Sequence, residues 1–188
     1  MPVTEDVFKD VMGNVPAAVT VVTALDEAGT PVGLTVSAFS VVSLRPPLAL
    51  VCIDKGSQTL PGVRDGGRFT VNFLADGAEE LAIRFASKSP DKFDGVPTRP
   101  APVPGCGPIL TGDACGYALC DVVRTVEAGD HWIFVGQVLD AALWRERRPL
   151  MYCRRTFSAW HAPEGDGLGS RPAQASGRAL GLMMTIEL

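Results

Sequence analysis

Apolar residues recur at helical spacing in only a few short stretches of the chain. Near the start, apolar positions from Val7 to Val15 repeat every three or four residues, with Thr4 as N-cap and Gly13-Asn14 near the end. The stretch 77–86 has the same spacing, with Asp76 and Glu79 as a capping-box-like start. A third helix is predicted from Ser57 to Val63, with Ser57 as cap and an interruption or end around Pro61-Gly62.

Most of the remaining chain alternates, or runs apolar for a few residues, as strands do. The two longest segments, 114–126 and 131–144, are joined by a predicted hairpin turn at 127–130. Shorter strands are predicted at 18–25, 32–38, 48–53, 69–75 and 150–160, and the continuous apolar run 48–53 suits a buried one. Six prolines between residues 87 and 108 predict a long loop. Many closely spaced strands with few helices predict a mainly β protein built as an antiparallel barrel.

Length and composition predict one soluble domain. The chain has 188 residues, 46% of them hydrophobic and 20% charged, which suits a single core. Its net charge is −4 with no polybasic run, which argues against nucleic-acid binding. Neither a signal-peptide pattern nor an apolar run of roughly 20 residues is present, so we expect a cytoplasmic protein without a membrane partner. The domain is expected to span residues 1–162, and the Gly-, Ser- and Ala-rich stretch 163–188 is expected to be a flexible tail.

Cysteine and glycine patterns restrict the chemistry further. Five cysteines form no CxxC pair and there are two histidines, so free, largely buried thiols are expected rather than disulfides or a metal site. A nucleophilic site pairing His131 with Cys52 or Cys120 has no support from spacing. The chain has no GxGxxG after its first strand and no P-loop, which disfavours a doubly wound dinucleotide fold without excluding a nicotinamide substrate.

Two neighbouring segments could bind a flat anionic ligand. Small residues follow one another from Thr35 to Ser40, where a strand that leaves its sheet would offer backbone N–H groups to a ring. The alternative is a sheet edge decorated with hydroxyls. The second segment, Asp54–Thr59, combines a strand end, a lysine, a glycine and hydroxyls before a predicted helix, as a phosphate cradle would. An ordinary capped turn explains it equally well.

Two further positions carry charge or a titratable ring. Ser87, Lys88 and Lys92 follow a predicted helix C-terminus, where the helix dipole favours cations in any case. Phe85 and Phe93 flank them and suit packing or the bracketing of a ligand. His131 lies beside Asp130 at the hairpin turn, where it could exchange a proton near neutral pH or could simply be a surface residue.

Taken together, these segments resemble the flavin reductase-like family in order and approximate spacing. The resemblance covers about Val7 to Trp160 and rests on Thr20–Thr23, Gly33–Phe39, Pro46–Leu48, Cys52–Asp54, Phe69–Asn72, Phe85 with Asp91–Phe93, and Gly129–His131 before Val135-Gly136. It implies a split antiparallel β-barrel of the Greek-key, FMN-binding type with a few short peripheral helices. It also implies a homodimer that binds flavin at or near the subunit interface.

The resemblance assigns roles by position. Thr35, Val36, Ser37 and Ala38 would border the flavin ring and ribityl chain, beside Cys52 and Asp54. The flavin phosphate would lie near Lys55, Ser57, Thr59, Ser87, Lys88, Lys92 and Phe93, and His131 would face the nicotinamide side. The sequence Pro16–Val19 departs from the family pattern, which often has a glycine there.

The activity implied is an NAD(P)H:flavin oxidoreductase. Its reaction would pass a hydride from NADH or NADPH to FMN or FAD, and the reduced flavin would supply a partner monooxygenase in a two-component system. One alternative is a non-catalytic split barrel that holds flavin or haem as an electron carrier. Another is an oxidase of the pyridoxamine-phosphate type, for which the sequence offers no arginine-rich substrate pocket.

Overall fold

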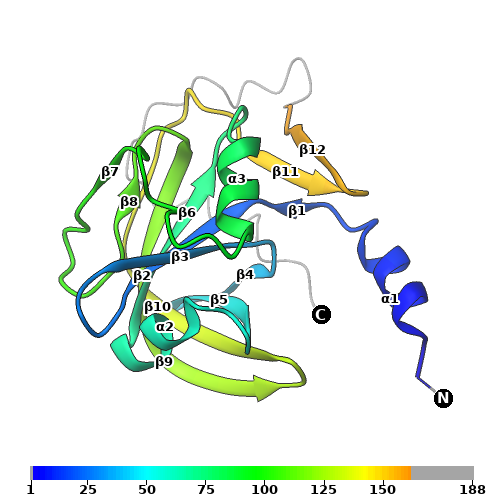
Figure 1. Ribbon diagram of the computed structural model, residues 1–188, viewed down its shortest axis with the longest axis horizontal. Coiled ribbons are helices and arrows are strands. Elements are labelled where there is room, and N and C mark those ends of the chain that lie inside the picture. Colours follow the sequence, from blue (N-terminus) through cyan, green and yellow to red (C-terminus); the bar gives the residue numbers. More distant parts are fainter. Residues whose placement is uncertain (1, 162–188) are drawn as a thin grey trace.

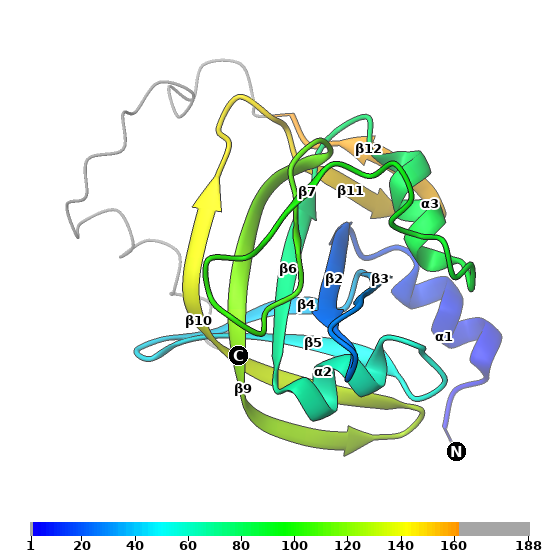
Figure 2. The same ribbon diagram turned by 60° about the vertical axis from the view of Figure 1, so that its left-hand side comes forward.

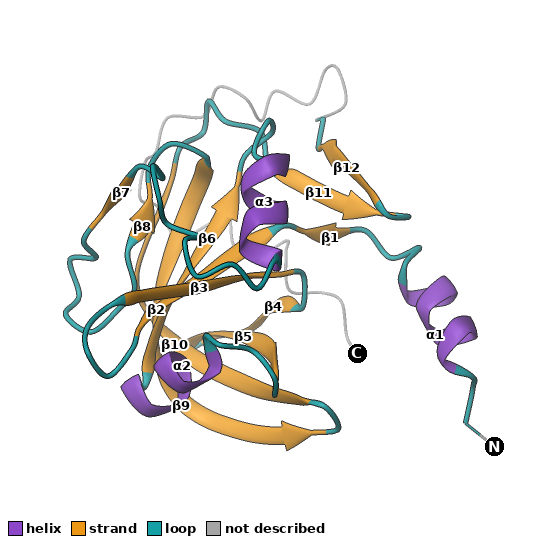
Figure 3. Ribbon diagram, in the orientation of Figure 1, coloured by secondary structure: helices purple, strands orange, loops and turns teal. Residues whose placement is uncertain are grey.

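The computed structural model describes residues 2–161 and is mainly β, with helices at the periphery (Figure 3). The helices are α1 (Glu5–Met12), α2 (Leu60–Gly66) and α3 (Glu79–Ala86). The strands are β1 (Ala17–Ala18), β2 (Thr20–Leu25), β3 (Pro31–Val36), β4 (Phe39–Leu44), β5 (Pro47–Asp54), β6 (Arg68–Leu74), β7 (Thr98–Arg99), β8 (Ile109–Leu110), β9 (Ala114–Ala128), β10 (His131–Leu143), β11 (Leu150–Cys153) and β12 (Thr156–Ala159). None of the helices within residues 2–161 has the length and apolar character needed to cross a bilayer.

The central element is a seven-stranded antiparallel sheet in the order β3-β2-β6-β9-β10-β5-β4. The sheet is strongly curved (Figures 1 and 2). Val36 of β3 and Val51 of β5, near opposite edges of the sheet, belong to one buried cluster with Phe69 and Phe134 from its middle. The sheet therefore curves around this cluster, and the predicted mainly β antiparallel architecture is confirmed.

The long hairpin β9–β10 forms as predicted, and it fixes the position of the predicted histidine. Its turn places Gly129 at φ 60°, a left-handed conformation that glycine adopts without steric cost. β10 also pairs with β5, with His131 opposite Asp54. The run 48–53 is not uniformly buried as expected. Ala49, Val51 and Ile53 face the core while their neighbours are partly exposed, because this strand has only one face on the core.

Helix α3 lies against β3, and this contact shapes one side of the site. Phe85 is fully buried, and a Cβ on Gly33 would lie 2.9 Å from its ring, so only glycine allows this close approach. The Thr35 hydroxyl donates to the carbonyl of Ala82 at 2.6 Å. The predicted capping box is wrong: α3 is preceded by Ala78 without a side-chain cap, and Asp76 instead pairs with Arg148 at 2.6 Å.

Helix α2 begins later than predicted. Ser57 accepts a hydrogen bond from the Thr59 amide, and the helix starts at Leu60. Pro61 stands in the first turn, where its missing N–H would have no partner within the helix anyway. Proline therefore starts this helix rather than interrupting it.

The predicted last strand, 150–160, is in fact the two-stranded hairpin β11–β12. Its turn residues Arg154 and Arg155 have φ values of 52° and 61°, in the left-handed region that costs a non-glycine residue roughly 1–2 kcal/mol. Contacts with the end of α1 compensate for part of that cost. The Arg154 amide donates to the Gly13 carbonyl at 2.7 Å, and its guanidinium Nε donates to Asn14 Oδ1 at 2.7 Å.

Helix α1 forms as the pattern predicts and projects from the barrel (Figure 1). The Thr4 hydroxyl accepts from the Val7 amide at 3.4 Å, which is the predicted N-cap. None of its residues is buried, although it carries an apolar stripe. The predicted flexible tail, 163–188, lies outside the described residues.

Candidate functional site

The segment Ser37–Ala38 lies beyond the end of β3, although the predicted strand included it, and it exposes unpaired donors. β3 ends at Val36, which is in the core, while Ser37 and Ala38 are exposed. Their carbonyls accept from the amides of Phe39 and Cys52, at 2.9 and 3.0 Å. Within residues 2–161, the backbone amides of Ser37 and Ala38 have no hydrogen-bond partner, and neither has the Ser37 hydroxyl. An exposed pair of backbone donors is therefore available to carbonyl or nitrogen acceptors of a ring.

Cys52 lies beside this segment, near the C-terminal end of β5. Its amide donates to the Ala38 carbonyl, and its partial burial raises the pKa of the thiol. A thiol with a raised pKa is a poor nucleophile at neutral pH, because little of it is ionised. Cys52 thus suits a packing position next to a ligand and not a catalytic nucleophile.

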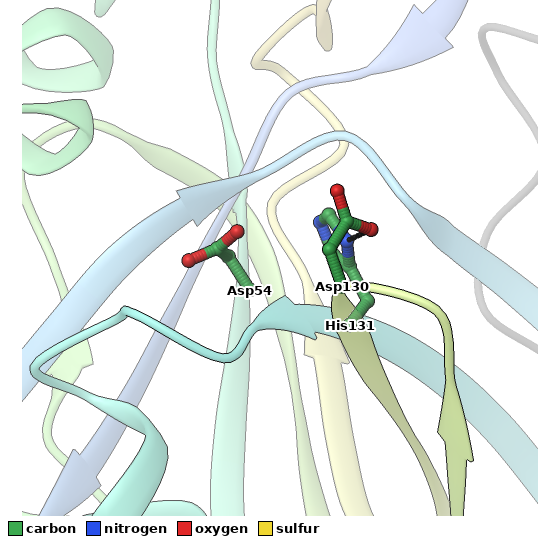
Figure 4. Close-up of side chains that lie close together, drawn as sticks. All are labelled: Asp54, Asp130 and His131. Carbon is green, nitrogen blue, oxygen red and sulfur yellow. Dashed lines mark hydrogen bonds and ion pairs between the residues drawn. The ribbon is translucent and has the colours of Figure 1, made fainter.

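The ends of β5 and β10 bring Asp54, Asp130 and His131 together (Figure 4). His131 Nδ1 lies 2.7 Å from Asp130 Oδ1, and this hydrogen bond is the main cause of a lowered Asp130 pKa. The ligand atoms of the three residues lie within 4.8 Å of one another, close enough for a metal ion, but exposed acidic groups often gather without one. The arrangement orients an imidazole whose Nδ1 is held and whose Nε2 is left for another group.

The turn after β5 holds the next predicted residues, and it is ordered by its own contacts. The Asp54 carboxylate accepts from the Gly56 amide at 2.7 Å, and the Lys55 ammonium pairs with Glu127. The Ser57 hydroxyl is partly buried, and Thr59 is only 2% exposed. Of this group, Lys55 and Ser57 are therefore more accessible to a phosphate than Thr59.

The predicted residues after α3 likewise differ in their accessibility to a ligand. Ser87 and Lys88 are exposed, and the Ser87 hydroxyl donates to the Arg84 carbonyl at 2.7 Å. Lys92 is buried, and its ammonium donates to the carbonyls of Gly33 and Phe85 at 3.1 and 3.0 Å. This burial lowers the pKa of Lys92. The Phe93 ring packs edge-on against the Phe85 ring, with 5.0 Å between the ring centroids. Phe93 and Lys92 therefore both hold this loop against α3.

Sequence reasoning missed one wall of the site, which the hairpin β11–β12 supplies. A cleft of about 370 Å³ lies beside Thr35 and Ser37, and Tyr152, Arg155 and Phe157 line it from the hairpin. One side of α3 forms the opposite wall of this cleft. The alternating pattern of 150–160 concealed the turn, because two arginines are not the residues that usually mark a tight hairpin.

Comparison with known proteins identifies the architecture. Residues 12–161 match the model of a family described as flavin reductase like domain. The chain is 41% identical over 160 residues to a flavin reductase (NADH) of Kitasatospora aureofaciens, covering 85% of this chain and 83% of that protein. It is 36% identical over 151 residues to the reductase subunit HsaB of a flavin-dependent monooxygenase from Rhodococcus jostii (strain RHA1), covering 80% and 75%.

A solved structure shares the fold. The NADH:FAD oxidoreductase SgcE6 of Streptomyces globisporus C-1027, in complex with NAD and FAD fragments, superposes with a TM-score of 0.78 at 34% identity. The match covers 86% of this chain and 96% of that one. The expected split β-barrel is thereby confirmed.

Proposed function

This chain belongs to the flavin reductase-like family, and from that premise we propose that it transfers a hydride from NADH or NADPH to FMN or FAD. The reduced flavin is released to a flavin-dependent monooxygenase, as the similarity to a reductase subunit of such a system supports. Within this structure, the observation that carries the proposal is the exposed segment Ser37–Ala38, whose two amides have no partner among residues 2–161.

These donors fit a flavin. The ring carbonyls and nitrogens of flavin are acceptors, and they gain negative charge on reduction, so two fixed amides stabilise the reduced ring more than the oxidised one. Flavin supplies the hydride-accepting chemistry when bound. Thr35 and Val36 hold the segment in place, since the Thr35 hydroxyl is bonded to α3 and Val36 is in the core. Cys52 and Asp54 extend the same surface along β5.

In this proposal, the accessible residues of the predicted set bind the phosphate end of the flavin. Lys88 and Ser87 are exposed after α3, and Lys55 and Ser57 follow β5. Lys92, Thr59 and Phe93 act mainly by holding these two loops against the barrel, since Lys92 and Thr59 are buried and Phe93 packs against Phe85. The division assigns direct binding to the first four residues and positioning to the other three.

His131 faces the nicotinamide in this proposal. Its Nδ1 is held by Asp130, so Nε2 can contact either the carboxamide of the nicotinamide or a proton acceptor on the flavin. Either contact would hold the nicotinamide and flavin rings in the relative orientation that hydride transfer requires, which is the main contribution of a protein to this reaction. No protein nucleophile takes part.

A homodimer completes the proposal. The apolar residues Phe8 and Val11 on α1 are each 55% exposed, and Val41 on β4 is 71% exposed. Unpartnered apolar surface on two separate elements supports a subunit interface. Five free cysteines support a reducing compartment, and hence the cytoplasm.

Steady-state oxidation of NADH and of NADPH, with FMN and FAD varied, tests the function. We expect nucleotide oxidation that depends on added flavin and saturates with it. A protein that retains bound flavin but consumes neither nucleotide would instead be an electron carrier, and the proposed activity would be wrong.

A further inference from the structure

The cleft between β3, α3 and the hairpin β11–β12 is larger than a flavin phosphate requires. Its volume is about 370 Å³. Ile83, Tyr152 and Phe157 give it apolar walls, and the two aromatic rings lie 4.9 Å apart at the hairpin. Polar groups enter it from Thr35, Ser37 and Arg155. Apolar walls with a few polar groups at one side are typical of a site for a flat, partly apolar ligand.

Two of the three polar groups of this cleft, Ser37 and Arg155, are without partners, whereas the Thr35 hydroxyl is already bonded to Ala82. Within the described part of the chain, neither the Arg155 guanidinium nor the Ser37 hydroxyl has a hydrogen bond or an ion pair. The neighbouring Arg154, by contrast, is committed to Asn14. A guanidinium can only donate, so this cleft offers a positive charge and hydrogen-bond donors to an anion.

The position of Arg155 is fixed by the turn that carries it. Arg154 anchors the turn to Gly13 and Asn14, and Arg155, whose own backbone is left-handed, lines the cleft. Three of the last four carbonyls of α3 already accept hydrogen bonds, which reduces their opposition to an anion here. Those of Ile83 and Arg84 accept from the Ser87 amide, and that of Phe85 accepts from Lys92.

We propose that this cleft binds the adenosine diphosphate part of a dinucleotide, with Arg155 on the diphosphate and the apolar walls against the adenosine. The proposal rests on the proposed function, which places the flavin ring at Ser37–Ala38 next to the cleft. FAD and NAD(P)H share this chemistry, whereas FMN has neither a diphosphate nor an adenosine. Arg155 is then a residue that selects dinucleotides over the mononucleotide.

The test compares Arg155→Asn with the wild type. Asparagine tolerates positive φ, so the turn should be retained, and Arg155→Lys restores the charge without the planar fork. Arg145→Asn is the matched control, because Arg145 lines a different cavity with Leu143 and Trp160. Equilibrium binding of FAD and FMN is measured by flavin fluorescence, and the KM for NADH is measured with FMN as acceptor.

Two results support the proposal and identify the ligand. A roughly tenfold weaker binding of FAD by Arg155→Asn, with FMN binding within about twofold of wild type, assigns the cleft to FAD. A roughly tenfold higher KM for NADH with FMN as acceptor assigns it to the nicotinamide dinucleotide. In either case Arg155→Lys should recover part of the loss, and Arg145→Asn should match the wild type.

Two other results overturn it. Equal weakening of FAD and FMN would mean that Arg155 contacts the phosphate common to both flavins. Values for Arg155→Asn that equal those of Arg145→Asn in every measurement would mean that the cleft binds no dinucleotide. Because flavin binding is measured without turnover, a failure of this inference is distinct from a failure of the proposed activity, which would appear in the wild type.

Discussion

At the scale of single residues, two lysines that lie four positions apart have different surroundings. Lys92 is 9% exposed and donates to the carbonyls of Gly33 and Phe85, whereas Lys88 is exposed on the loop after α3. A buried ammonium is tolerated when its donors are satisfied, and the two carbonyls in turn depend on it. The structural contribution of the pair should therefore come almost entirely from Lys92.

Lys92→Met should lower the free energy of unfolding by about 1–3 kcal/mol, because it leaves two buried carbonyls without a donor. Lys88→Met is the matched control and should change stability by less than about 0.5 kcal/mol, while weakening flavin binding. Urea denaturation and flavin titration of both variants measure the two effects. Equal stability of the two variants would contradict the structural role of Lys92.

The five thiols should react at different rates in the folded protein. Cys106, Cys115 and Cys120 are buried, and burial is the main cause that raises the pKa of Cys120 to about 12. Only the thiolate is alkylated, so at about pH 8 a small alkylating reagent should label Cys153 first and Cys52 more slowly, since the Cys52 pKa is also raised. Labelling of Cys52 should rise as the pH increases.

FMN provides the control for this experiment. If Cys52 lies beside the flavin, saturating FMN should slow its labelling and leave that of Cys153 unchanged. Peptide mass spectrometry assigns each site. Rapid native-state labelling of Cys120 would show that the described core is wrong at this point.

At the scale of elements, α1 is the clearest candidate for a contact between subunits. It has no buried residue, so its apolar stripe contributes nothing to the core of its own barrel. The double variant Phe8→Ser, Val11→Ser should therefore leave the fold intact and weaken a dimer roughly tenfold or more. Light scattering across a concentration series measures the mass.

Lys9→Ser changes the polar face of the same helix and serves as the control. Lys9 forms an exposed pair with Glu5 at 3.3 Å, which should contribute little. This variant should remain a dimer. A monomeric wild type, or a double variant with unchanged mass, would remove α1 from any interface.

The sequence predicted most elements because their patterns are local. Alternating residues defined β6, β9 and β10, and Thr4 with the Val7–Val15 spacing defined α1. The turn of β11–β12 could not be predicted, because the left-handed backbones of Arg154 and Arg155 depend on contacts with Gly13 and Asn14. The Arg154–Asn14 hydrogen bond joins residues that are 140 positions apart in the sequence. Asp76 was misplaced for a similar reason, because its partner Arg148 is distant in sequence.

At the scale of the whole molecule, the barrel gathers segments that are far apart along the chain. Ser37–Ala38 follows β3, His131 begins β10, and Arg155 is carried by the last hairpin. The sequence resemblance assigned the first two to the site, and the third emerged only from the cleft that the hairpin and α3 line together. The proposed path of the ligand thus runs from the nicotinamide side at His131, past the exposed amides, to the cleft.

The central claim is that this arrangement passes a hydride directly from nicotinamide to flavin. Anaerobic rapid mixing of NADH with the protein and FAD tests it most directly, with reduction followed by the loss of flavin absorbance. We predict reduction at a rate that saturates with NADH, and a rate about 100-fold slower or more in His131→Ala, with FAD affinity within about twofold of wild type. Flavin that stays oxidised in the wild type, or a His131→Ala variant as fast as the wild type, would contradict the account.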